Sequence, residues 1–530
     1  MLLEYRCYVD GPLTPDEPTV RTRAERMIRH LSNWATLKWE KLEILVPVDE
    51  SGRSGLWKLS DGILVLAARH SLQCIRLPSP LKGIEFKRWE HRFPAVTVHD
   101  ISLDPSQDLV IINSFFLSED ALEMRDDDVV GRTIVSRFLS LESGSAHPLA
   151  QSPTLKSQSS SFRRGGRLES QISGDMYGIL VLEISGTSSE LLAYQWKSAS
   201  LKSALRFQGY AKSFAFFSEN IVALCFQSEP GCPPSVTLFK LGVPSGTSGY
   251  TVLANFLFPT VLGELESYFH ISCLSPRASG SDLNATPHGL HPSYSPENQM
   301  VSILWRLCRM SPRRTSLITS RDLFVYVPLH RLLLLSRLDC ANPGADRSST
   351  NDDPILSIPW EEWGEKYAYV KDVPFVLQRG DGSHHQCEDE FRRGLFLGRG
   401  PSWGRFGSAA YGKRCVTADF KMGIVAVLDF VSPDKFAPVW VDYDDKGDLV
   451  RREYPWDEMF VSDECVLPMG EVFGLQEYSM RTRMRYSTRA KVWSDGVPNS
   501  GKSKLMIDAE HIVLSETSPT SSTMLTVLTM

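Results

Sequence analysis

Apolar and polar positions along this chain recur as pairs of short apolar runs joined by tight polar turns. Examples are 96–102 with 109–112, 213–217 with 221–226, and 415–420 with 424–428. Short apolar runs bounded by turn-forming residues are typical of β-strands. In each pair the second run is the more continuously apolar, which favours burial on both faces between neighbouring sheets. The pattern predicts a scaffold of repeated β-hairpins.

Additional apolar runs extend this pattern along the chain. Asp61–Gly62 lies between two of them, and an Asp-Gly pair in this position is a strong hairpin signal. Further strands are expected at 56–59, 63–66, 72–77, 133–139, 179–184, 191–196, 235–241, 301–307, 323–327, 331–336 and 437–443. Some spacings between successive second strands are close to the roughly 40–45 residues of a propeller blade.

Groups of three or four strands without helices between them argue against a parallel α/β sheet. We therefore predict an all-β chain folded as a β-propeller of roughly six to eight blades, with about seven as the central value. A two-domain β-sandwich is the structural alternative. In either case the sequence predicts a rigid scaffold that presents loops.

One helix is expected before the first hairpin, within residues 19–43. Thr22 is placed to cap it, Glu25 follows at the capping-box position, and Trp34 continues the apolar face at helical spacing. The helix is expected to end near Trp39. The chain is thus divided into an N-terminal helical segment at 1–50, a propeller-like domain at 51–480, and C-terminal strands with a flexible tail at 481–530.

Three stretches are rich in Ser, Gly, Pro and other polar residues. They lie near 143–175, 275–299 and 341–354. Each contains too few apolar side chains to offset the entropy lost on ordering. We expect these stretches to be disordered loops.

Composition narrows the class of protein. The 530 residues are 42% hydrophobic and 23% charged, with a formal net charge of −6, which is ordinary for a globular protein and unlike a basic nucleic-acid binder. No run approaches the length of a membrane span, and the start lacks the layout of a signal peptide. Ten cysteines include no C-x-x-C pair. A reducing compartment, cytoplasm or nucleus, is therefore expected.

A P-loop spelling occurs near the C-terminus, from Gly496 through Gly501 and Lys502 to Ser503. A true P-loop joins a buried strand to a helix, so that backbone amides hold phosphates and the lysine reaches the outer ones. Here the following residues, 504–507, read at least as well as a strand. The match is interpreted as fortuitous, and no cofactor is expected.

Two acidic or histidine-containing segments have the residue types of metal ligands. His384, His385 and Cys387 lie in a polar loop with no second ligand pair nearby, and the aspartates of 442–448 lack the glutamate that completes a calcium loop. No metal site is predicted. Gly-x-Ser-x-Gly occurs nowhere, and spacing shows no Ser/His/Asp or Cys/His set, so no catalytic residue is assigned.

Clustered arginines suggest one mode of binding. Arginines at 306, 309, 313, 314 and 321, together with 163, 164 and 167, have the chemistry to recognise acidic or phosphorylated peptides. Solvated loop charge is the alternative interpretation of the same residues. Tryptophans such as Trp360 and Trp363 are expected to pack within the blades.

Several phrases near the N-terminus resemble fungal F-box proteins. They are Leu2-Leu3-Glu4-Tyr5, Asp10-Gly11-Pro12, Gly55-Leu56-Trp57, the run from Leu77 to Ile84, and the run from Asp104 to Val110. The resemblance covers most of residues 1–140 and, more loosely, the later hairpins. In that family an F-box binds the adaptor of a cullin ligase, and the β-rich remainder captures a substrate for ubiquitylation. This chain resembles the part that follows the F-box, and no Leu-Pro-x-Glu-type helix pair is present.

The resemblance implies a non-enzymatic protein-interaction module that recognises a protein or peptide. The ubiquitin-ligase adaptor is a partner only where an F-box is supplied. Neither nucleic acid nor membrane is an expected partner. Two alternatives remain open at this point: a propeller-fold hydrolase with an active site in its channel, and a nucleotide binder that uses residues 496–503.

Overall fold

A computed structural model gives the fold of the chain. The residues it describes are 8–10, 19–47, 56–117, 132–159, 166–183, 188–208, 213–227, 232–242, 249–259, 265–273, 290–292, 299–310, 317–337, 356–375, 406–411, 414–419, 424–430, 440–443, 449–452, 460–462, 465–468, 479–482, 486–492, 503–517 and 522–530.

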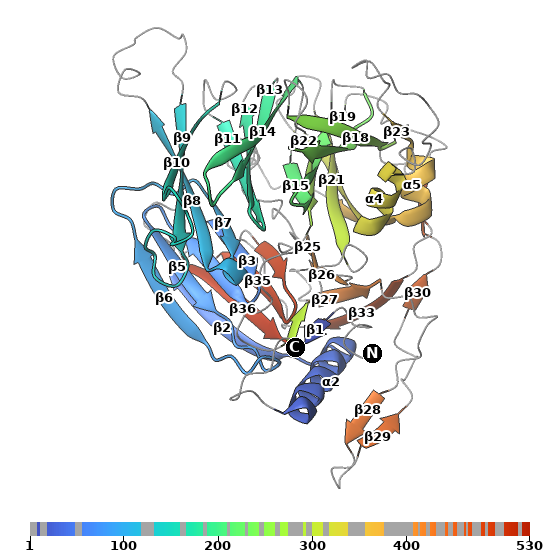
Figure 1. Cartoon of the computed structure of the whole chain (residues 1–530). Helices are drawn as coiled ribbons and strands as arrows, with labels where there is room; N and C mark the ends of the chain where they lie inside the picture. The colour runs from blue at the N-terminus through green and yellow to red at the C-terminus, as the bar shows by residue number, and fades with distance from the viewer. Residues whose placement is uncertain are drawn as a thin grey trace, which may run out of the picture.

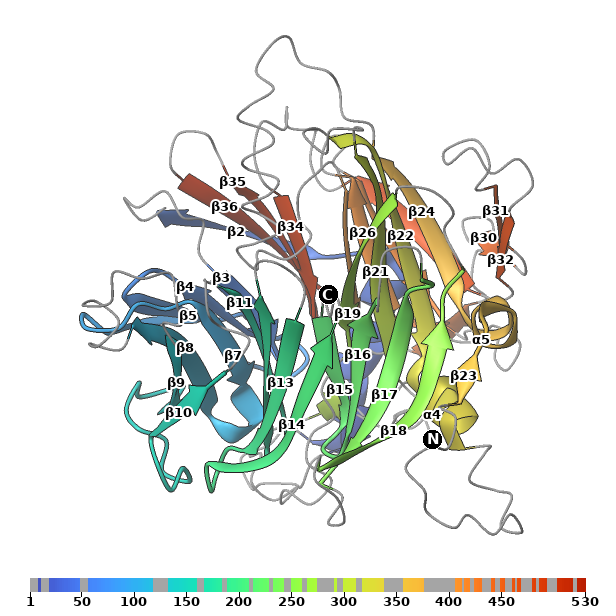
Figure 2. The same cartoon turned by 90° about the horizontal axis from the view of Figure 1, so that it is seen from above.

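Sheets of four or five strands form a ring in this part of the chain (Figures 1 and 2). Seven such sheets are present in the described residues, and we call them blades 1 to 7. The first four are blade 1, β3 (Leu56–Ser60), β4 (Ile63–Ala67), β5 (Ser71–Arg76) and β6 (Lys87–Arg92); blade 2, β7 (Asp100–Asp104), β8 (Leu109–Leu117), β9 (Arg132–Ser140) and β10 (Thr154–Gln158); blade 3, β11 (Gly166–Ser173), β12 (Met176–Glu183), β13 (Ser188–Gln195) and β14 (Ser200–Gln208); and blade 4, β15 (Ser213–Ser218), β16 (Ile221–Phe226), β17 (Ser235–Leu241), β18 (Tyr250–Leu257) and β23 (Ser357–Ile358).

The remaining blades are less regular in strand order. They are blade 5, β19 (Leu265–Ser272), β21 (Met300–Met310), β22 (Leu317–Pro328) and β24 (Tyr369–Phe375); blade 6, β25 (Phe406–Tyr411), β26 (Arg414–Asp419), β27 (Ile424–Asp429), β33 (Tyr486–Val492) and β30 (Phe460–Ser462); and blade 7, β34 (Ser503–Ile507), β35 (His511–Thr517), β36 (Ser522–Thr529) and β2 (Glu40–Pro47). Smaller pairs are β1 (Tyr8–Asp10) with β20 (Leu290–Pro292), β28 (Trp440–Tyr443) with β29 (Leu449–Arg452), and β31 (Cys465–Pro468) with β32 (Ser479–Thr482).

The leading strands of neighbouring blades contact one another, which places them innermost in the ring. These contacts join β3 with β7, β7 with β11, β11 with β15, β15 with β19, and β25 with β34. Small, mostly antiparallel sheets arranged in this way define a β-propeller, so the predicted fold class is confirmed.

Strands from both ends of the sequence complete blade 7. The early strand β2 pairs antiparallel with β36 along its whole length, and β34, β35 and β36 follow one another in the sequence (Figure 1). The propeller therefore extends beyond the predicted bounds of 51–480, because β2 and β33 to β36 belong to the ring. The chain passes from β2 of blade 7 to β3 of blade 1, and the ring is closed inside blade 7, where hydrogen bonds pair β2 with the C-terminal strand β36.

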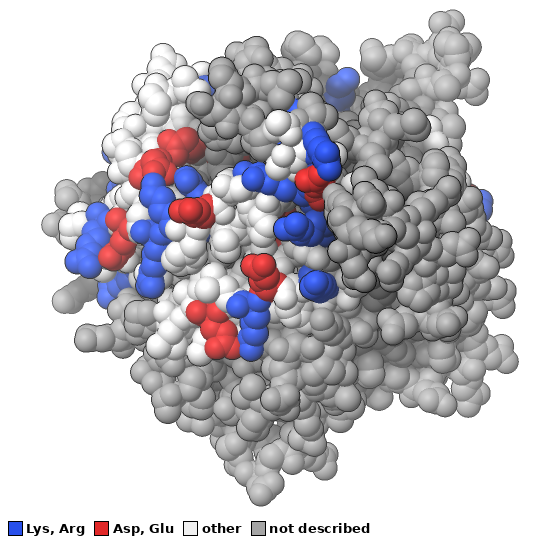
Figure 3. Space-filling model, turned by 90° about the horizontal axis from the view of Figure 1, so that it is seen from below, with Lys and Arg blue, Asp and Glu red and all other residues white. Residues whose placement is uncertain are grey.

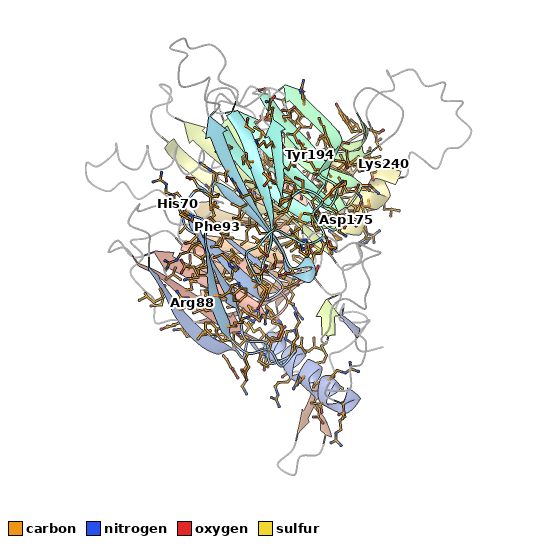
Figure 4. The ribbon with its side chains drawn as sticks, turned by 60° about the vertical axis from the view of Figure 1, so that its left-hand side comes forward. His70, Arg88, Phe93, Asp175, Tyr194 and Lys240 are labelled. Carbon is orange, nitrogen blue, oxygen red and sulfur yellow. The ribbon has the colours of Figure 1, made fainter. Side chains whose placement is uncertain are left out.

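The second strand of blade 2 shows why the apolar runs are so continuous. Residues 109–112 of β8 are fully buried. Leu109 and Ile111 pack with blade 3, whereas Val110 and Ile112 pack with blade 1. Alternate side chains of one strand thus fill the spaces on both of its sides, as the sequence pattern predicted. Figure 4 shows side chains filling the spaces between blades in the same way.

Helix α2 (Val20–Thr36) begins earlier than the sequence suggested. Thr19 is the N-cap, and its hydroxyl accepts a hydrogen bond from the Thr22 backbone N–H at 3.3 Å. The prediction of Thr22 as the cap is therefore wrong by one helical turn. The helix ends at Leu37 in a left-handed conformation, close to the predicted end near Trp39.

A strand predicted at 331–336 is instead helix α4 (Leu329–Arg337), and α5 (Trp360–Tyr367) follows it. Leu329, Leu332, Leu333 and Ser336 are buried at helical spacing, and Leu334 is exposed. A short apolar run of this kind is compatible with a strand or a helix, and here the helix forms because it buries one apolar face.

The predicted disorder of 143–175 is also wrong, because β10 and β11 lie within it. Both strands contain few large apolar residues, yet β10 forms the outer edge of blade 2 and β11 forms the inner edge of blade 3. Strand β20 lies within the stretch 275–299. Residues 274–289 and 293–298 on its two sides lie outside the described residues, and so do residues 341–354. The run at 437–443 pairs as β28 with β29, and β33 takes the place beside β27.

Candidate functional site

Charged and polar side chains meet on the inner strands of blades 1 to 5. We call this set the inner-strand cluster; its members are Lys58 on β3, Asp100 on β7, Arg167 and Glu169 on β11, Ser213 on β15 and His270 on β19. Their charges act on one another across the ring: Lys58 and Glu169 both shift the pKa of Asp100, and Glu169, Arg167 and Lys58 all shift that of His270. The repeated hairpins bring together residues up to about 200 positions apart.

Three members of this cluster have the residue types of a hydrolase. Ser213 donates its hydroxyl hydrogen to Glu169 Oε1 at 2.7 Å, and His270 Nδ1 lies 3.1 Å from Ser213 Oγ. Glu169 Oε1 is 3.9 Å from the same His270 nitrogen. In a catalytic triad the histidine uses one nitrogen for the serine and the other for the acid. Here the serine and the acid face one nitrogen, so the carboxylate does not orient the imidazole as a base.

The protonation states agree with this reading. Burial lowers the pKa of His270, and the nearby Glu169 carboxylate offsets this only in part, so the imidazole is neutral near neutral pH. Ser213 is fully buried. An acyl substrate would have to displace packed side chains to reach its oxygen. The contacts among these three residues join blades 3, 4 and 5.

Asp100 anchors a second polar network, between blades 2 and 3. Ser170 donates a hydrogen bond to the Asp100 carboxylate, and Asn113 Nδ2 donates to Ser170 Oγ at 2.9 Å. Ser136 and Tyr177 both donate to Asn113 Oδ1, at 2.7 and 2.5 Å. Burial raises the pKa of Asp100 above its ordinary value, although the charge of Lys58 on blade 1 opposes the shift. The network satisfies buried polar groups at the joint between these blades.

Helix α2 is attached to the closing region of the ring. Trp34 Nε1 donates to the Ala509 carbonyl oxygen at 3.1 Å, and His30 Nδ1 lies 3.4 Å from the Met530 carbonyl oxygen. The Arg414 guanidinium of blade 6 stacks over the Trp34 ring at 4.7 Å. Burial, reinforced by the positive charge of Arg414, lowers the pKa of His30 to about 3, so His30 is a neutral donor. The helix is thus fixed to blades 6 and 7.

The residues singled out by the sequence fall into separate places. Gly496, Gly501 and Lys502 lie outside the described residues, and Ser503 is the first residue of strand β34. A P-loop requires a helix at that point, so the observed strand argues against nucleotide binding by this segment. The histidines of 384–385 also lie outside the described residues.

The predicted arginine cluster is divided between different places, whereas two of the tryptophans pack as expected. Arg306 is buried within β21, so it is not a solvated loop charge. Arg167 belongs to the inner-strand cluster, and Arg163 and Arg164 lie outside the described residues. Trp360 and Trp363 are buried in the aromatic core between blades 4 and 5, which confirms their expected packing role. The inner-strand cluster was missed because its members meet only through blade-to-blade packing.

The described residues also bear on two other properties, metal binding and membrane spanning. No group of three His, Cys, Asp or Glu side chains in this part of the chain is placed to hold a metal ion. Among the helices whose residues the structure describes, none combines the length and the apolar character needed to cross a membrane.

Comparisons with known proteins add little. No family model matches the chain, and no curated protein matches it. One similar solved structure is a functionally unknown protein from Desulfotomaculum acetoxidans DSM 771, with a TM-score of 0.31 and 9% identity over 75% of this chain and 84% of that chain. Another is the β-propeller domain of the Trilobed protease from Pyrococcus furiosus, with a TM-score of 0.24 and 11% identity over 76% of this chain and 98% of that chain. Likeness at this level carries no functional argument, and the strand pairing itself establishes the fold.

Proposed function

We propose that this chain is a protein-interaction module that acts like the substrate-binding part of an F-box ubiquitin-ligase receptor. The observation that carries the proposal is the attachment of α2 to the ring through Trp34, His30 and Arg414. A ligase receptor must hold its substrate at a fixed position relative to the element that recruits the ligase. A helix fixed to the propeller at three points meets that mechanical requirement.

The inner-strand cluster supports a binding role over a catalytic one. Ser213, Glu169 and His270 bond to one another across blades, and this arrangement lacks the two-sided histidine of a triad. A partner would therefore bind to the outer surface of the ring. Seen from below, the described surface carries basic and acidic side chains next to one another (Figure 3). Mixed charge of this kind suits the polar rim of a protein interface.

Affinity capture with quantitative mass spectrometry tests this function. The tagged chain is incubated with extract from a fungal cell, the source that the resemblance implies, and is compared with the tag alone. Recovery of the ubiquitin-ligase adaptor and cullin supports the ligase-receptor form of the proposal. Recovery of other proteins without these two supports a free-standing binding module. Recovery of nothing above the tag control contradicts both forms.

A propeller-fold hydrolase is the second candidate, because Ser213 Oγ lies within hydrogen-bonding distance of His270 Nδ1. A serine-reactive fluorophosphonate separates it from the binding module. Labelling of Ser213 in the folded protein would favour the hydrolase, and absence of labelling favours the binding module.

A further inference from the structure

The turn between β34 and β35 joins the last blade of the ring to the first. Its residues Asp508, Glu510 and His511 are each at most 2% exposed. Asp508 Oδ2 accepts a hydrogen bond from the Gly62 backbone N–H at 2.7 Å. Ser79 Oγ donates to Glu510 Oε2 at 2.5 Å. Because Gly62 lies in the turn between β3 and β4 and Ser79 in the connection between β5 and β6, this turn fixes β34 and β35 of blade 7 to blade 1, and we call the set the closure clasp.

His511 occupies the centre of the closure clasp. Its Nδ1 lies 2.9 Å from Asp508 Oδ1, and its Nε2 lies 2.9 Å from the Pro78 carbonyl oxygen. The carbonyl oxygen can only accept a hydrogen bond, and so can the ionised carboxylate. A neutral imidazole carries one N–H and therefore satisfies one of these contacts, whereas the imidazolium satisfies both.

A second buried histidine shows the contrasting arrangement. His147 Nε2 lies 2.8 Å from the Gln107 carbonyl oxygen, and His147 Nδ1 accepts a hydrogen bond from the Leu149 backbone N–H at 3.2 Å. One nitrogen donates and the other accepts, so the neutral ring satisfies both contacts. His147 thus provides a matched control for His511 within the same fold.

The charged groups around His511 favour its proton. Asp508 and Glu510 lie on its own turn, and Lys82 Nζ, in the segment after β5, is 3.6 Å from Glu510 Oε1. His30 on α2 interacts electrostatically with His511 and Lys82, and Arg414 on β26 acts in turn on His30. Burial by itself lowers the pKa of His511, but the charge and hydrogen bond of Asp508, with the charge of Glu510, raise it above the ordinary value of 6.5.

We propose that the closure clasp is proton-dependent: His511 holds blade 7 against blade 1 as an imidazolium, and its deprotonation loosens this joint. The consequence reaches α2. Ala509 and Met530 accept hydrogen bonds from Trp34 and His30, and they lie beside the clasp residues in the sequence and in the strand pairing. Loosening of the clasp therefore weakens the hydrogen bonds that attach α2 to blade 7.

The direction of the pH effect follows from linkage. Because the folded pKa of His511 is raised, its stabilising contribution is complete below the unfolded pKa of 6.5 and is lost as pH rises through the folded pKa. In that window, opening of the clasp releases one proton. The equilibrium constant for opening then rises by about tenfold per pH unit.

Hydrogen exchange of the full chain tests the proposal. Backbone protection factors, corrected for the intrinsic pH dependence of exchange, are measured from about pH 5.5 to pH 9 around the ordinary histidine pKa. Protection in β34, β35 and β36 is expected to fall above the unfolded pKa of 6.5. Protection in β12 and β13 of blade 3 is expected to stay constant. Loss of protection equal in both blades, or in neither, overturns the proposal.

Variants then assign the effect. His511→Gln is expected to lower protection of blade 7 at pH 6 and to abolish its pH dependence, whereas His147→Gln is expected to keep that dependence. If His511→Gln retains the pH dependence, the proposal fails. If that variant does not fold, the wild-type chain with ¹⁵N-labelled histidine decides. His511 must then show two protonated ring nitrogens at about pH 6, below its ordinary pKa of 6.5, and a ring with one protonated nitrogen at that pH refutes the clasp.

Discussion

Two buried aspartates offer a direct test of how charge stabilises the ring. Asp508 lies in the closure clasp and Asp100 on an inner strand, and each is at most 7% exposed. We consider the substitutions Asp508→Asn and Asp100→Asn, which keep the shape of the side chain and remove its negative charge. A simple burial argument predicts similar effects for both, whereas the surroundings of the two carboxylates predict effects of different size.

The Asp508 carboxylate accepts four hydrogen bonds. Backbone N–H groups of Gly62, Glu510 and His511 donate at 2.7, 2.9 and 2.8 Å, and the His511 ring donates at 2.9 Å. Although burial opposes ionisation, the His511 charge and these bonds lower the pKa of Asp508 from 3.8 to about 2. An asparagine would turn its NH₂ group toward one of the donors and leave the imidazolium without its counter-charge. Breaking a buried ion pair in this way costs about 3–5 kcal/mol.

Asp100 has two neutral donors, the Ser170 hydroxyl and the Ile101 backbone N–H, in place of four. Ser170 donates to its Oδ2, and burial raises the pKa of the carboxyl group. Because asparagine resembles the protonated acid, Asp100→Asn removes a charge that burial disfavours. We expect its free energy of unfolding at pH 7 to change by less than about 1 kcal/mol, the scale of one hydrogen bond.

Urea unfolding at pH 7 and at lower pH measures both effects. The Asp508 contribution is present above the unfolded pKa of 3.8 and is lost as pH falls toward about 2. Asp508→Asn should therefore flatten the acid side of the stability profile, and Asp100→Asn should not. The reasoning is refuted if the two variants lose equal stability at pH 7, or if Asp508→Asn loses less than about 1 kcal/mol, the scale of one neutral hydrogen bond.

Three further predictions concern the inner strands and the P-loop spelling. Ser213→Ala leaves the partly buried Glu169 carboxylate without its hydroxyl donor, so urea unfolding should show a loss of about 1–3 kcal/mol, and a change below this range would show that the bond is not formed. Gly178→Ala places a methyl group 2.8 Å from the Phe214 ring, so the melting temperature should fall by the equivalent of about 1–3 kcal/mol; an unchanged melting temperature would contradict the close packing of blades 3 and 4. Millimolar Mg-ATP should leave the melting temperature of wild type and of Lys502→Ala equal, because Ser503 begins a strand, and stabilisation of wild type alone would restore the nucleotide-binding alternative.

The period-2 and continuous apolar patterns predicted most of the ring because they report burial directly. Residues 109–112 and 221–226 became the second strands of their blades, and the Asp61–Gly62 turn formed with Asp61 and Gly62 both at positive φ. The pattern failed at 331–336, where four consecutive leucines satisfy a strand and a helix equally well. It also failed at β10 and β11, whose order comes from pairing with neighbouring strands more than from their own apolar content.

The candidate site was beyond local sequence reasoning for a different reason. Glu169, Ser213 and His270 each lie on a strand of a different blade, and their spacing in the sequence reflects loop lengths. These spacings therefore do not predict that the three side chains meet where the inner strands pack together. The resemblance to F-box proteins concerned the N-terminal region and was silent on these residues, and it stays a proposal. The P-loop spelling is a local pattern that can be recognised in the sequence, and its last residue, Ser503, begins strand β34.

The polar joints of the ring differ in the charge of the side chains that form them. Blades 2 and 3 follow each other in the sequence, and neutral groups such as Asn113 and Tyr177 form most of their polar joint. In blade 7 the C-terminal strands β34 to β36 meet the chain that leads to blade 1 only through the pairing of β36 with β2, and the joint of these strands with blade 1 uses the ionised pair of Asp508 and His511. Charge-assisted hydrogen bonds are the stronger kind, and they depend on pH. The joint where the C-terminal strands meet blade 1 is thus the one whose strength protons can change, and α2 is attached beside that joint.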